Sequence, residues 1–173
     1  MTDNTALPKV TIYSDGGCSP NPGFGSWAAL LMFKHDSGEM AEKTISGFNA
    51  NTTNNQMELT AAIEALESLK MPCEVMFYTD SEYLKNGITK WMKGWIKNGW
   101  RTSAHQPDGK GGVNIVPTRP VQNQDLWQRL NKAIQRHKIA WHWVKGHAKD
   151  ENNNRVDRLV TQTREDARRN YQP

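Results

Sequence analysis

Residues 10–25, VTIYSDGGCSPNPGFG, decide the fold class of this chain. The first part, residues 10–14, is rich in β-branched and aromatic residues, which is typical of a strand. The glycines and prolines that follow are typical of a loop. The pattern therefore predicts a strand that ends at Asp15, with the carboxylate at the carboxyl end of that strand.

Residues 75–79, VMFYT, repeat this design further along the chain. They form a short apolar run that is typical of a buried strand, and the run ends at Asp80. Ser81 is placed to cap a following helix. Open α/β sheets bind their ligands beyond the carboxyl ends of their strands, so both acids are candidates for a site at that edge.

The rest of the chain completes an α/β pattern. Alternation and turn signals predict further strands over residues 26–33, 39–48 and 139–144. Helical spacing predicts helices over residues 57–70, 81–86, 88–98 and 125–137, and an arginine-rich final helix after residue 152 that begins near Asp157. We expect a five-stranded mixed sheet flanked by helices in one domain, residues 1–173, with a flexible N-terminus over 1–8 and an extended loop over 102–121.

The composition is that of an ordinary globular protein, with 36% hydrophobic and 23% charged residues in 173. No apolar run approaches the roughly 20 residues of a membrane span, and residues 1–8 do not resemble a secretory signal. Cys18 and Cys73 lie in no metal-binding or disulfide pattern, so we expect reduced thiols. These features predict a cytoplasmic protein with no membrane association.

Positive charge is concentrated in one segment, residues 83–124. This segment contains a single acid, Asp108, and seven basic residues: Lys85, Lys90, Lys93, Lys97, Arg101, Lys110 and Arg119. A basic segment on a chain that also gathers carboxylates elsewhere is typical of a protein that binds a polyanion.

Glu58 is the third candidate acid. In the helix predicted around it, Glu64 and Glu67 lie on other faces, so Glu58 is expected to face inward among apolar residues. An unpaired inward charge costs several kcal/mol unless a cation compensates it. Each acid alone also has an ordinary explanation, because strand-end aspartates often cap helices and inward glutamates often pair with arginine. Convergence of all three, with oxygen ligands only, favours Mg²⁺ or Mn²⁺.

Four blocks of sequence, in this order, resemble the bacterial ribonuclease HI family and cover nearly the whole chain: YSDGGCSPNPG, TTNNQMELTAAIEAL, YTDSEYL and WVKGHAKDENNNRVDRL. The resemblance implies the ribonuclease H-like fold. It also implies metal-binding carboxylates at Asp15, Glu58, Asp80 and Asp157, and a mobile catalytic histidine at His147.

The implied activity is that of an endonuclease, a ribonuclease H, that hydrolyses the RNA strand of RNA–DNA hybrids. Two Mg²⁺ ions, for which Mn²⁺ can substitute, would lie about 3.5–4 Å apart and promote in-line attack by water. The products would carry 5′-phosphate and 3′-hydroxyl ends. His147 could move a proton to the leaving group or help the product depart. A monomer with no obligate protein partner is expected.

Hybrid binding is expected at two places. Lys90, Lys93 and Lys97 recur at helical spacing, with Trp91 and Trp95 between them and Trp100 and Arg101 after. This segment resembles the basic protrusion of the family, which grips the DNA strand, although the tryptophans could equally pack the helix, and Trp91 and Trp95 are expected to be partly in the core. The resemblance also implies backbone contacts, including 2′-hydroxyl recognition, around Cys18, Asn21, Thr53 and Asn54.

The chain departs from the family pattern at a few positions. Glu82 stands where glutamine is frequent, Gln56 where some relatives carry arginine, and Val160 and Thr161 where small alanines are usual. The segment 103–120 is longer than in the familiar bacterial enzymes, and a plain surface insertion is the simplest explanation. The competing functions are a transposase or integrase core or a DNA nuclease, and a non-catalytic hybrid-binding module. All four acids and His147 are retained, which argues against the last of these.

Overall fold

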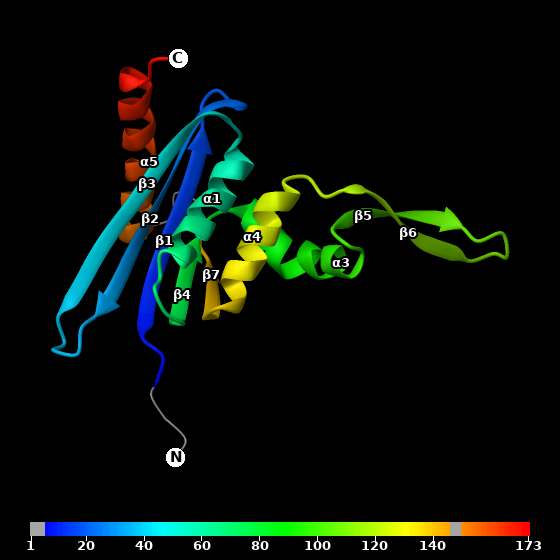
Figure 1. Cartoon of the computed structure of the whole chain (residues 1–173), viewed down its shortest axis with the longest axis horizontal. Coiled ribbons are helices and arrows are strands. Elements are labelled where there is room, and N and C mark those ends of the chain that lie inside the picture. Colours follow the sequence, from blue (N-terminus) through cyan, green and yellow to red (C-terminus); the bar gives the residue numbers. More distant parts are fainter. Residues whose placement is uncertain (1–5, 146–149) are drawn as a thin grey trace.

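The computed structural model describes residues 6–145 and 150–173. Its main sheet has five strands in the order β3-β2-β1-β4-β7, which confirms the predicted α/β class with a mixed sheet (Figure 1). The strands of this sheet are β1 (Lys9–Cys18), β2 (Gly23–Lys34), β3 (Met40–Thr52), β4 (Glu74–Thr79) and β7 (Lys138–Trp143). The helices are α1 (Asn54–Glu67), α2 (Glu82–Asn86), the π-helix η1 (Gly87–Trp91), α3 (Met92–Lys97), α4 (Gln124–Gln135) and α5 (Glu151–Asn170).

Strand β1 is the centre of the sheet and is longer than predicted. It pairs antiparallel with β2 as far as Cys18, because Gly16 and Gly17 continue the ladder opposite Trp27 and Ser26. The prediction that the strand ends at Asp15 was therefore wrong. Its parallel pairing with β4 stops earlier, at Tyr13. Asp15 thus lies on the part of β1 that continues past its pairing with β4.

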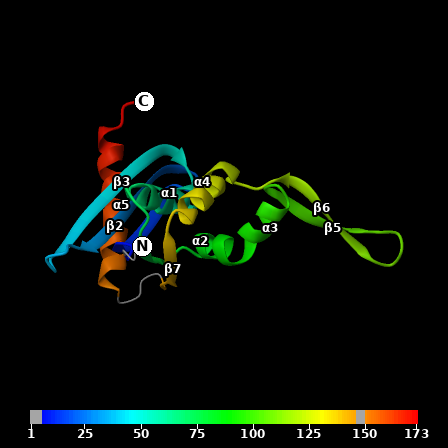
Figure 2. The same cartoon turned by 60° about the horizontal axis from the view of Figure 1, so that its bottom comes forward.

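Alternating side chains give the sheet two apolar faces. On one face Ile12 and Leu31 join a core that includes Ile63 of α1 and Leu130 of α4. On the other face Tyr13, Ala28 and Leu30 pack with Val156 and Val160 of α5. The sheet therefore lies between α1 and α4 on one side and α5 on the other (Figures 1 and 2).

A group of aromatic residues fixes the segment from α2 to α3 against α4. Trp127 of α4 is fully buried and donates a hydrogen bond from Nε1 to the Tyr83 hydroxyl at 3.0 Å. The ring of Trp95 in α3 lies 5.4 Å from that of Trp127. A Cβ atom at Gly87 would lie 1.9 Å from the Trp127 ring, so only glycine allows this approach. The helix that carries the lysines is therefore held firmly on the core.

The segment predicted as an extended loop over residues 102–121 is a β-hairpin, which is a correction to the sequence prediction. It consists of β5 (Arg101–Pro107) and β6 (Val113–Pro120), which form a separate two-stranded antiparallel sheet. The carboxylate of Asp108 accepts hydrogen bonds from the N–H groups of Lys110 and Gly112, at 2.7 and 2.8 Å, and so closes the turn. The glycines lie in this turn and Pro107 and Pro120 at strand ends, whereas Pro117 lies within β6, next to a shift in the register of the ladder.

The final helix also begins earlier than predicted. It starts at Glu151 because the Asp150 side chain accepts hydrogen bonds from the N–H groups of Asn152 and Asn153 and caps it. Of the predicted flexible N-terminus, residues 1–5 lie outside the described residues, and residues 6–8 precede β1. In the described part of the chain, no helix combines the length and the apolar character needed to cross a membrane.

Candidate functional site: a cluster of carboxylates

Four different elements carry the four predicted carboxylates. Asp15 lies in β1, Glu58 near the start of α1, Asp80 directly after β4, and Asp157 in the second turn of α5. The parallel register of β1 with β4, continued two residues past its last pair, sets Asp15 beside Asp80. Asp15, Glu58 and Asp80 are half-buried, whereas Asp157 is exposed.

The electrostatics of Asp15 show that these acids lie close together. Burial raises the pKa of Asp15 from 3.8 to about 8, and the charges of Asp80, Asp157 and Glu58 contribute to the rise, while the Gly16 N–H opposes it. Coulomb interactions weaken with distance, so all three other acids must lie within short range of Asp15. A carboxyl group with this pKa is mostly protonated at pH 7 unless a cation neutralises the cluster.

Glu58 faces the same site. The pKa of Glu58 is raised to about 6. Burial is the main cause and the charge of Asp80 adds to it, whereas a hydrogen bond from Ser81 opposes the rise. The Ser81 hydroxyl donates that bond to Oε2 of Glu58 and also accepts one from the Leu84 N–H at 3.0 Å. Ser81 therefore caps α2 and orients the Glu58 carboxylate with the same oxygen atom.

Close contact between β1 and α1 brings Asp15 and Glu58 together. A Cβ atom at Gly16 would lie 2.3 Å from the carbonyl carbon of Met57 and 2.6 Å from the backbone nitrogen of Glu58. Real Cβ atoms do not approach a backbone so closely, so any residue other than glycine would push the helix away from the strand. Gly16 thereby sets the separation of the two acids on either side of this contact.

The donor set fits a divalent cation held in an open site. Within residues 6–145 and 150–173, no three His, Cys, Asp or Glu side chains are grouped closely enough to hold a metal ion by themselves. Mg²⁺ is usually held by one or two carboxylates, with water molecules and substrate phosphates as its other ligands, so a group of three protein ligands is not required. Burial is the main cause of the raised pKa of Asp15, and repulsion from the other acids adds to it; a bound cation would relieve this repulsion.

His147 lies outside the described residues. The described chain before it leaves the sheet at Val144, whose N–H donates to the carbonyl oxygen of Thr79 at 3.0 Å. Thr79 immediately precedes Asp80. The segment that leads to His147 therefore starts next to the strand end that carries a candidate metal ligand.

The residues predicted around the β1–β2 loop form a connected group. The Cys18 N–H donates to Oδ1 of Asn54 at 2.6 Å, and the Asn54 N–H donates to Oδ1 of Asn21 at 3.1 Å. Thr53 caps α1 by accepting a bond from the Gln56 N–H. The Cys18 thiol is buried and donates to the carbonyl oxygens of Pro20 and Thr52. These bonds hold the loop against the start of α1, next to the carboxylates.

The predicted basic face lies on η1 and α3. Lys90, Lys93 and Lys97 are all exposed. Trp95 packs against the core, but Trp91 lies outside it, with 38% of its surface exposed and its ring 5.7 Å from that of Trp95. The expectation that Trp91 is partly in the core was therefore wrong, because its ring lies against Tyr83 and Trp95, which themselves pack on the core. Trp91 thus adds an exposed aromatic surface beside the lysines.

Three positions contribute to the site in ways that the sequence did not reveal. Gly16 carried no prediction, and Ser81 was expected only to cap a helix. Gln56 was noted only as a position where some relatives carry arginine, but its amide accepts a bond from the Thr52 hydroxyl at 2.8 Å and donates one to Asn123 at 3.1 Å. The only local sign of this role for Gly16 is its place directly after the candidate acid Asp15. That place does not reveal which helix packs against the strand there.

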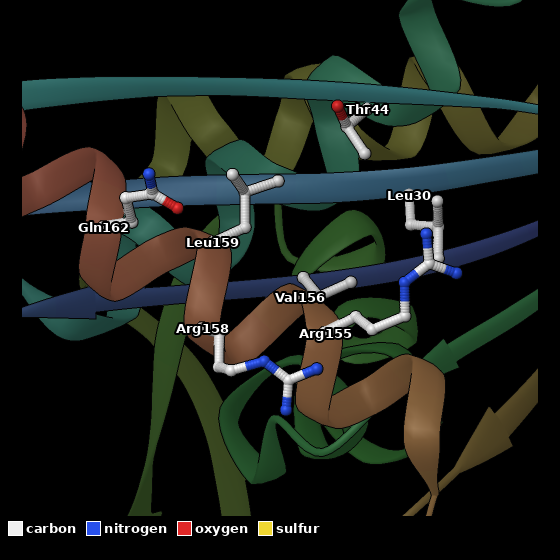
Figure 3. A pocket seen from close by; sticks show the side chains of 7 residues that line it. All are labelled: Leu30, Thr44, Arg155, Val156, Arg158, Leu159 and Gln162. Carbon is white, nitrogen blue, oxygen red and sulfur yellow. The ribbon is translucent and has the colours of Figure 1, made fainter.

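A separate pocket of about 290 Å³ lies between the sheet and α5 (Figure 3). Leu30, Val156 and Leu159 supply its apolar side chains, and Arg155 and Arg158 are the charged residues that line it. Arg155 is paired with Glu42 and Arg158 with Glu151. None of the four carboxylates lines this pocket, so it is distinct from the candidate site.

Comparison with known proteins gives one consistent result. The family model for RNase H matches residues 8–165. A ribonuclease H from Gluconobacter oxydans (strain 621H) is 52% identical over 159 residues, which cover 92% of this chain and 94% of the relative. A ribonuclease H from Bradyrhizobium diazoefficiens is 52% identical over 154 residues, which cover 89% of this chain and 88% of the relative.

Solved structures agree with the fold. LC9-RNase H1, a type 1 RNase H with the type 2 active-site motif, superposes with a TM-score of 0.77 at 25% identity, over 95% of this chain and 75% of that one. LC11-RNase H1, solved in complex with an RNA/DNA hybrid, gives a TM-score of 0.60 at 22% identity, over 92% of this chain and 99% of that one. Because the family model spans most of the sequence and the relatives share half of its residues, the chain belongs to the ribonuclease H family.

Proposed function

We propose that this chain hydrolyses the RNA strand of RNA–DNA hybrids in a reaction that depends on two divalent cations, leaving 5′-phosphate and 3′-hydroxyl ends. One observation carries the proposal: the pKa of Asp15 is raised to about 8 by burial and by the charges of Asp80, Asp157 and Glu58. Membership of the ribonuclease H family makes the chain an endoribonuclease, and this cluster is the candidate for its catalytic centre.

The four carboxylates are the proposed metal ligands. Bound there, a pair of Mg²⁺ or Mn²⁺ ions would lower the pKa of the attacking water and stabilise the negative charge on the leaving 3′ oxygen. Ser81 keeps the Glu58 carboxylate oriented towards this place through its hydroxyl. Gly16 keeps β1 and α1 close enough for Asp15 and Glu58 to act on one phosphate. His147 is the proposed proton shuttle to the leaving group, as its motif implies.

The hybrid is proposed to bind along two surfaces. The linked residues Cys18, Asn21 and Asn54, with Thr53 at the start of α1, lie beside the carboxylates and would contact the sugar and phosphate backbone, including the 2′-hydroxyls that distinguish RNA. The lysines of η1 and α3, with Trp91 and Trp95 between them and Trp100 and Arg101 after, would contact phosphates of the DNA strand. These contacts position the duplex without reading its sequence.

We expect one domain that acts as a monomer in the cytoplasm. Both cysteines are unpaired and buried, which fits a reducing compartment.

A cleavage assay tests the proposal. Labelled RNA is supplied in an RNA–DNA hybrid or in double-stranded RNA, with duplex DNA as a third substrate, in Mg²⁺ or in EDTA. Cleavage of the hybrid RNA alone, only with Mg²⁺, and with 5′-phosphate products is the expected result. Asp80→Asn should abolish cleavage and preserve hybrid binding, whereas Asp36→Asn, in the exposed β2–β3 turn, should cleave like the original chain.

Two outcomes would contradict the proposal. Efficient cutting of duplex DNA would favour the rival reading as a DNA nuclease or an integrase-like core. Hybrid binding without cleavage in any divalent metal would favour a binding module.

A further inference from the structure

The β5–β6 hairpin projects away from the body of the molecule (Figures 1 and 2). Its strands pair only with each other, and neither joins the five-stranded sheet. A strand rises about 3.3 Å per residue, so the seven residues of β5 reach about 23 Å from the end of α3. That distance corresponds to about 13 phosphate charges along a nucleic-acid duplex, at one per 1.7 Å of axis.

The base of the hairpin is fixed to the basic helix. Gly99 and Trp100 both have left-handed backbone conformations, with φ of 68° and 63°, which end the helical segment and turn the chain into β5. The Trp100 N–H donates to the Trp95 carbonyl at 2.6 Å, the Val121 N–H donates to the Trp100 carbonyl at 3.1 Å, and the Trp100 ring packs on the core. The hairpin therefore has a defined direction relative to α3.

The charge of the hairpin continues that of the helix. Arg101 and Arg119 lie at its base, where the Arg101 guanidinium donates to the carbonyl oxygen of Thr118, and Lys110 lies at its tip; all three are exposed. Its one acid, Asp108, is occupied by two N–H groups of the turn. In the described part of the chain, no ion pair involves any basic residue between Lys85 and Arg119. The seven basic residues of this segment outnumber its one carboxylate, so the surface keeps a net positive charge.

We propose that the hairpin is an extension of the nucleic-acid-binding surface, in which Arg119 at its base and Lys110 at its tip contact backbone phosphates of the hybrid, and Lys110 reaches phosphates beyond those contacted by the lysines of η1 and α3. This inference rests on the proposed function, because it assigns further contacts to the same substrate. The hairpin lengthens the bound stretch of duplex and adds affinity that depends on hybrid length and on salt.

The alternative partner for the hairpin surface is a second copy of the chain. Val113 and Ile115 are 60% and 63% exposed, and they share a face with Pro107 and His105, their partners across the ladder. Exposed apolar side chains on a two-stranded sheet can support self-association. The uncompensated charge on the same element opposes this, because two copies would bring like charges together.

The test compares two double variants with the same net charge. Lys110→Gln with Arg119→Gln removes two of the three hairpin cations and leaves Arg101, whose guanidinium is bonded within the hairpin. Lys34→Gln with Lys70→Gln removes two cations that line a different pocket at the amino end of β1. Hybrids of about 20 and about 8 base pairs are titrated by fluorescence anisotropy in EDTA over a range of KCl concentrations. They span about 68 and about 27 Å, so the long hybrid can cover both the basic helix and the hairpin, whereas the short one is little longer than the hairpin alone.

The hairpin variant should bind the long hybrid at least about tenfold more weakly at 0.1 M salt, with a log–log salt slope shallower by about 1.8, as expected for two lost phosphate contacts. It should also lose most of the preference for long over short hybrids, and the control variant should keep both properties. Equal slopes and length preferences in the two variants would overturn the inference. So would a dimer in sedimentation experiments that Ile115→Ser abolishes.

Cleavage by the unmodified chain separates this inference from the proposed function. If the unmodified chain cuts hybrid RNA with Mg²⁺ but the hairpin variant binds like the control, only the hairpin inference fails. If the unmodified chain does not cut the hybrid at all, the proposed function fails independently of the binding data.

Discussion

Gly16 lies so close to Met57 that an added Cβ atom would be 2.3 Å from the Met57 carbonyl carbon. Gly16 follows Asp15 in β1, and Met57 precedes Glu58 in α1, so this contact lies directly between the two acids. The position of one hydrogen-sized side chain therefore sets how close two proposed metal ligands can come.

Replacing Gly16 should damage both the fold and the activity. In Gly16→Ala the methyl group collides with backbone rather than with a side chain that could move, so the free energy of unfolding should fall by about 1–3 kcal/mol or more. Hybrid cleavage should fall further than the loss of folded protein explains, because the acids separate. Urea denaturation and Mg²⁺-dependent cleavage rates measure the two effects.

Gly94→Ala is the matched control for Gly16→Ala. An added Cβ atom at Gly94 meets nothing within 4 Å, so the free energy of unfolding should rise by less than about 1 kcal/mol. Equal behaviour of the two variants would contradict this role for Gly16.

The stability of the metal-free protein should fall as pH rises. The pKa of Asp15 is about 8 in the folded chain and 3.8 in the unfolded reference, so between these values the folded state binds more protons. Stability is then fully present below pH 3.8 and declines by up to about 1.4 kcal/mol per pH unit until the folded carboxyl group ionises near pH 8. Glu58, with a folded pKa of about 6, adds to the decline. Urea denaturation in EDTA between pH 5 and pH 8 measures this.

Two comparisons sharpen the pH experiment. Asp15→Asn should flatten the decline, because the amide does not ionise. Mg²⁺ should restore more stability at pH 8 than at pH 5, because the cation binds the ionised cluster. The same dependence of stability on pH in Asp15→Asn and in the original chain would show that Asp15 has no raised pKa in the folded state.

Removing the Ser81 hydroxyl should raise the pKa of Glu58 above about 6, since the hydrogen bond from Ser81 is what lowers it. Ser81→Ala should also lose about 1 kcal/mol of stability, because the same hydroxyl caps α2. Carbon-13 NMR titration of the Glu58 carboxyl group in the metal-free protein measures the first effect separately from the second. Ser81→Thr retains a hydroxyl and should restore the original pKa. A Glu58 pKa that stays the same in Ser81→Ala would argue against the orienting role.

Changing Lys90, Lys93 and Lys97 together to glutamine should weaken hybrid binding and reduce its salt dependence. If each lysine contacts one phosphate, the log–log slope becomes shallower by about 2.7, because fewer counterions are released. The matched control changes Lys34, Lys43 and Lys70, which line a pocket away from α3. Titration of an uncleaved hybrid over a range of KCl concentrations measures both variants. A slope that stays unchanged in the first variant would mean that the lysines are only a solvated surface.

Much of the fold and the identity of the candidate acids could be predicted from the sequence. Short apolar runs ending in Asp15 and Asp80 indicate strands, and a helical repeat placed Glu58 inward, because side-chain periodicity is a local property of each element. The hairpin at residues 101–120 was missed for the same reason. Its turn depends on hydrogen bonds to Asp108 that propensities do not describe, so its glycines and prolines indicated a loop.

The sequence by itself determined which chemical groups this chain carries and which elements bear them. Only the tertiary structure decided that β1 passes α1 at backbone contact through Gly16, that Ser81 orients Glu58, and that Trp100 directs the hairpin from the end of the basic helix. Each of these relationships joins residues whose approach depends on how whole elements pack, and close-packed interiors fix such distances only after the chain has folded.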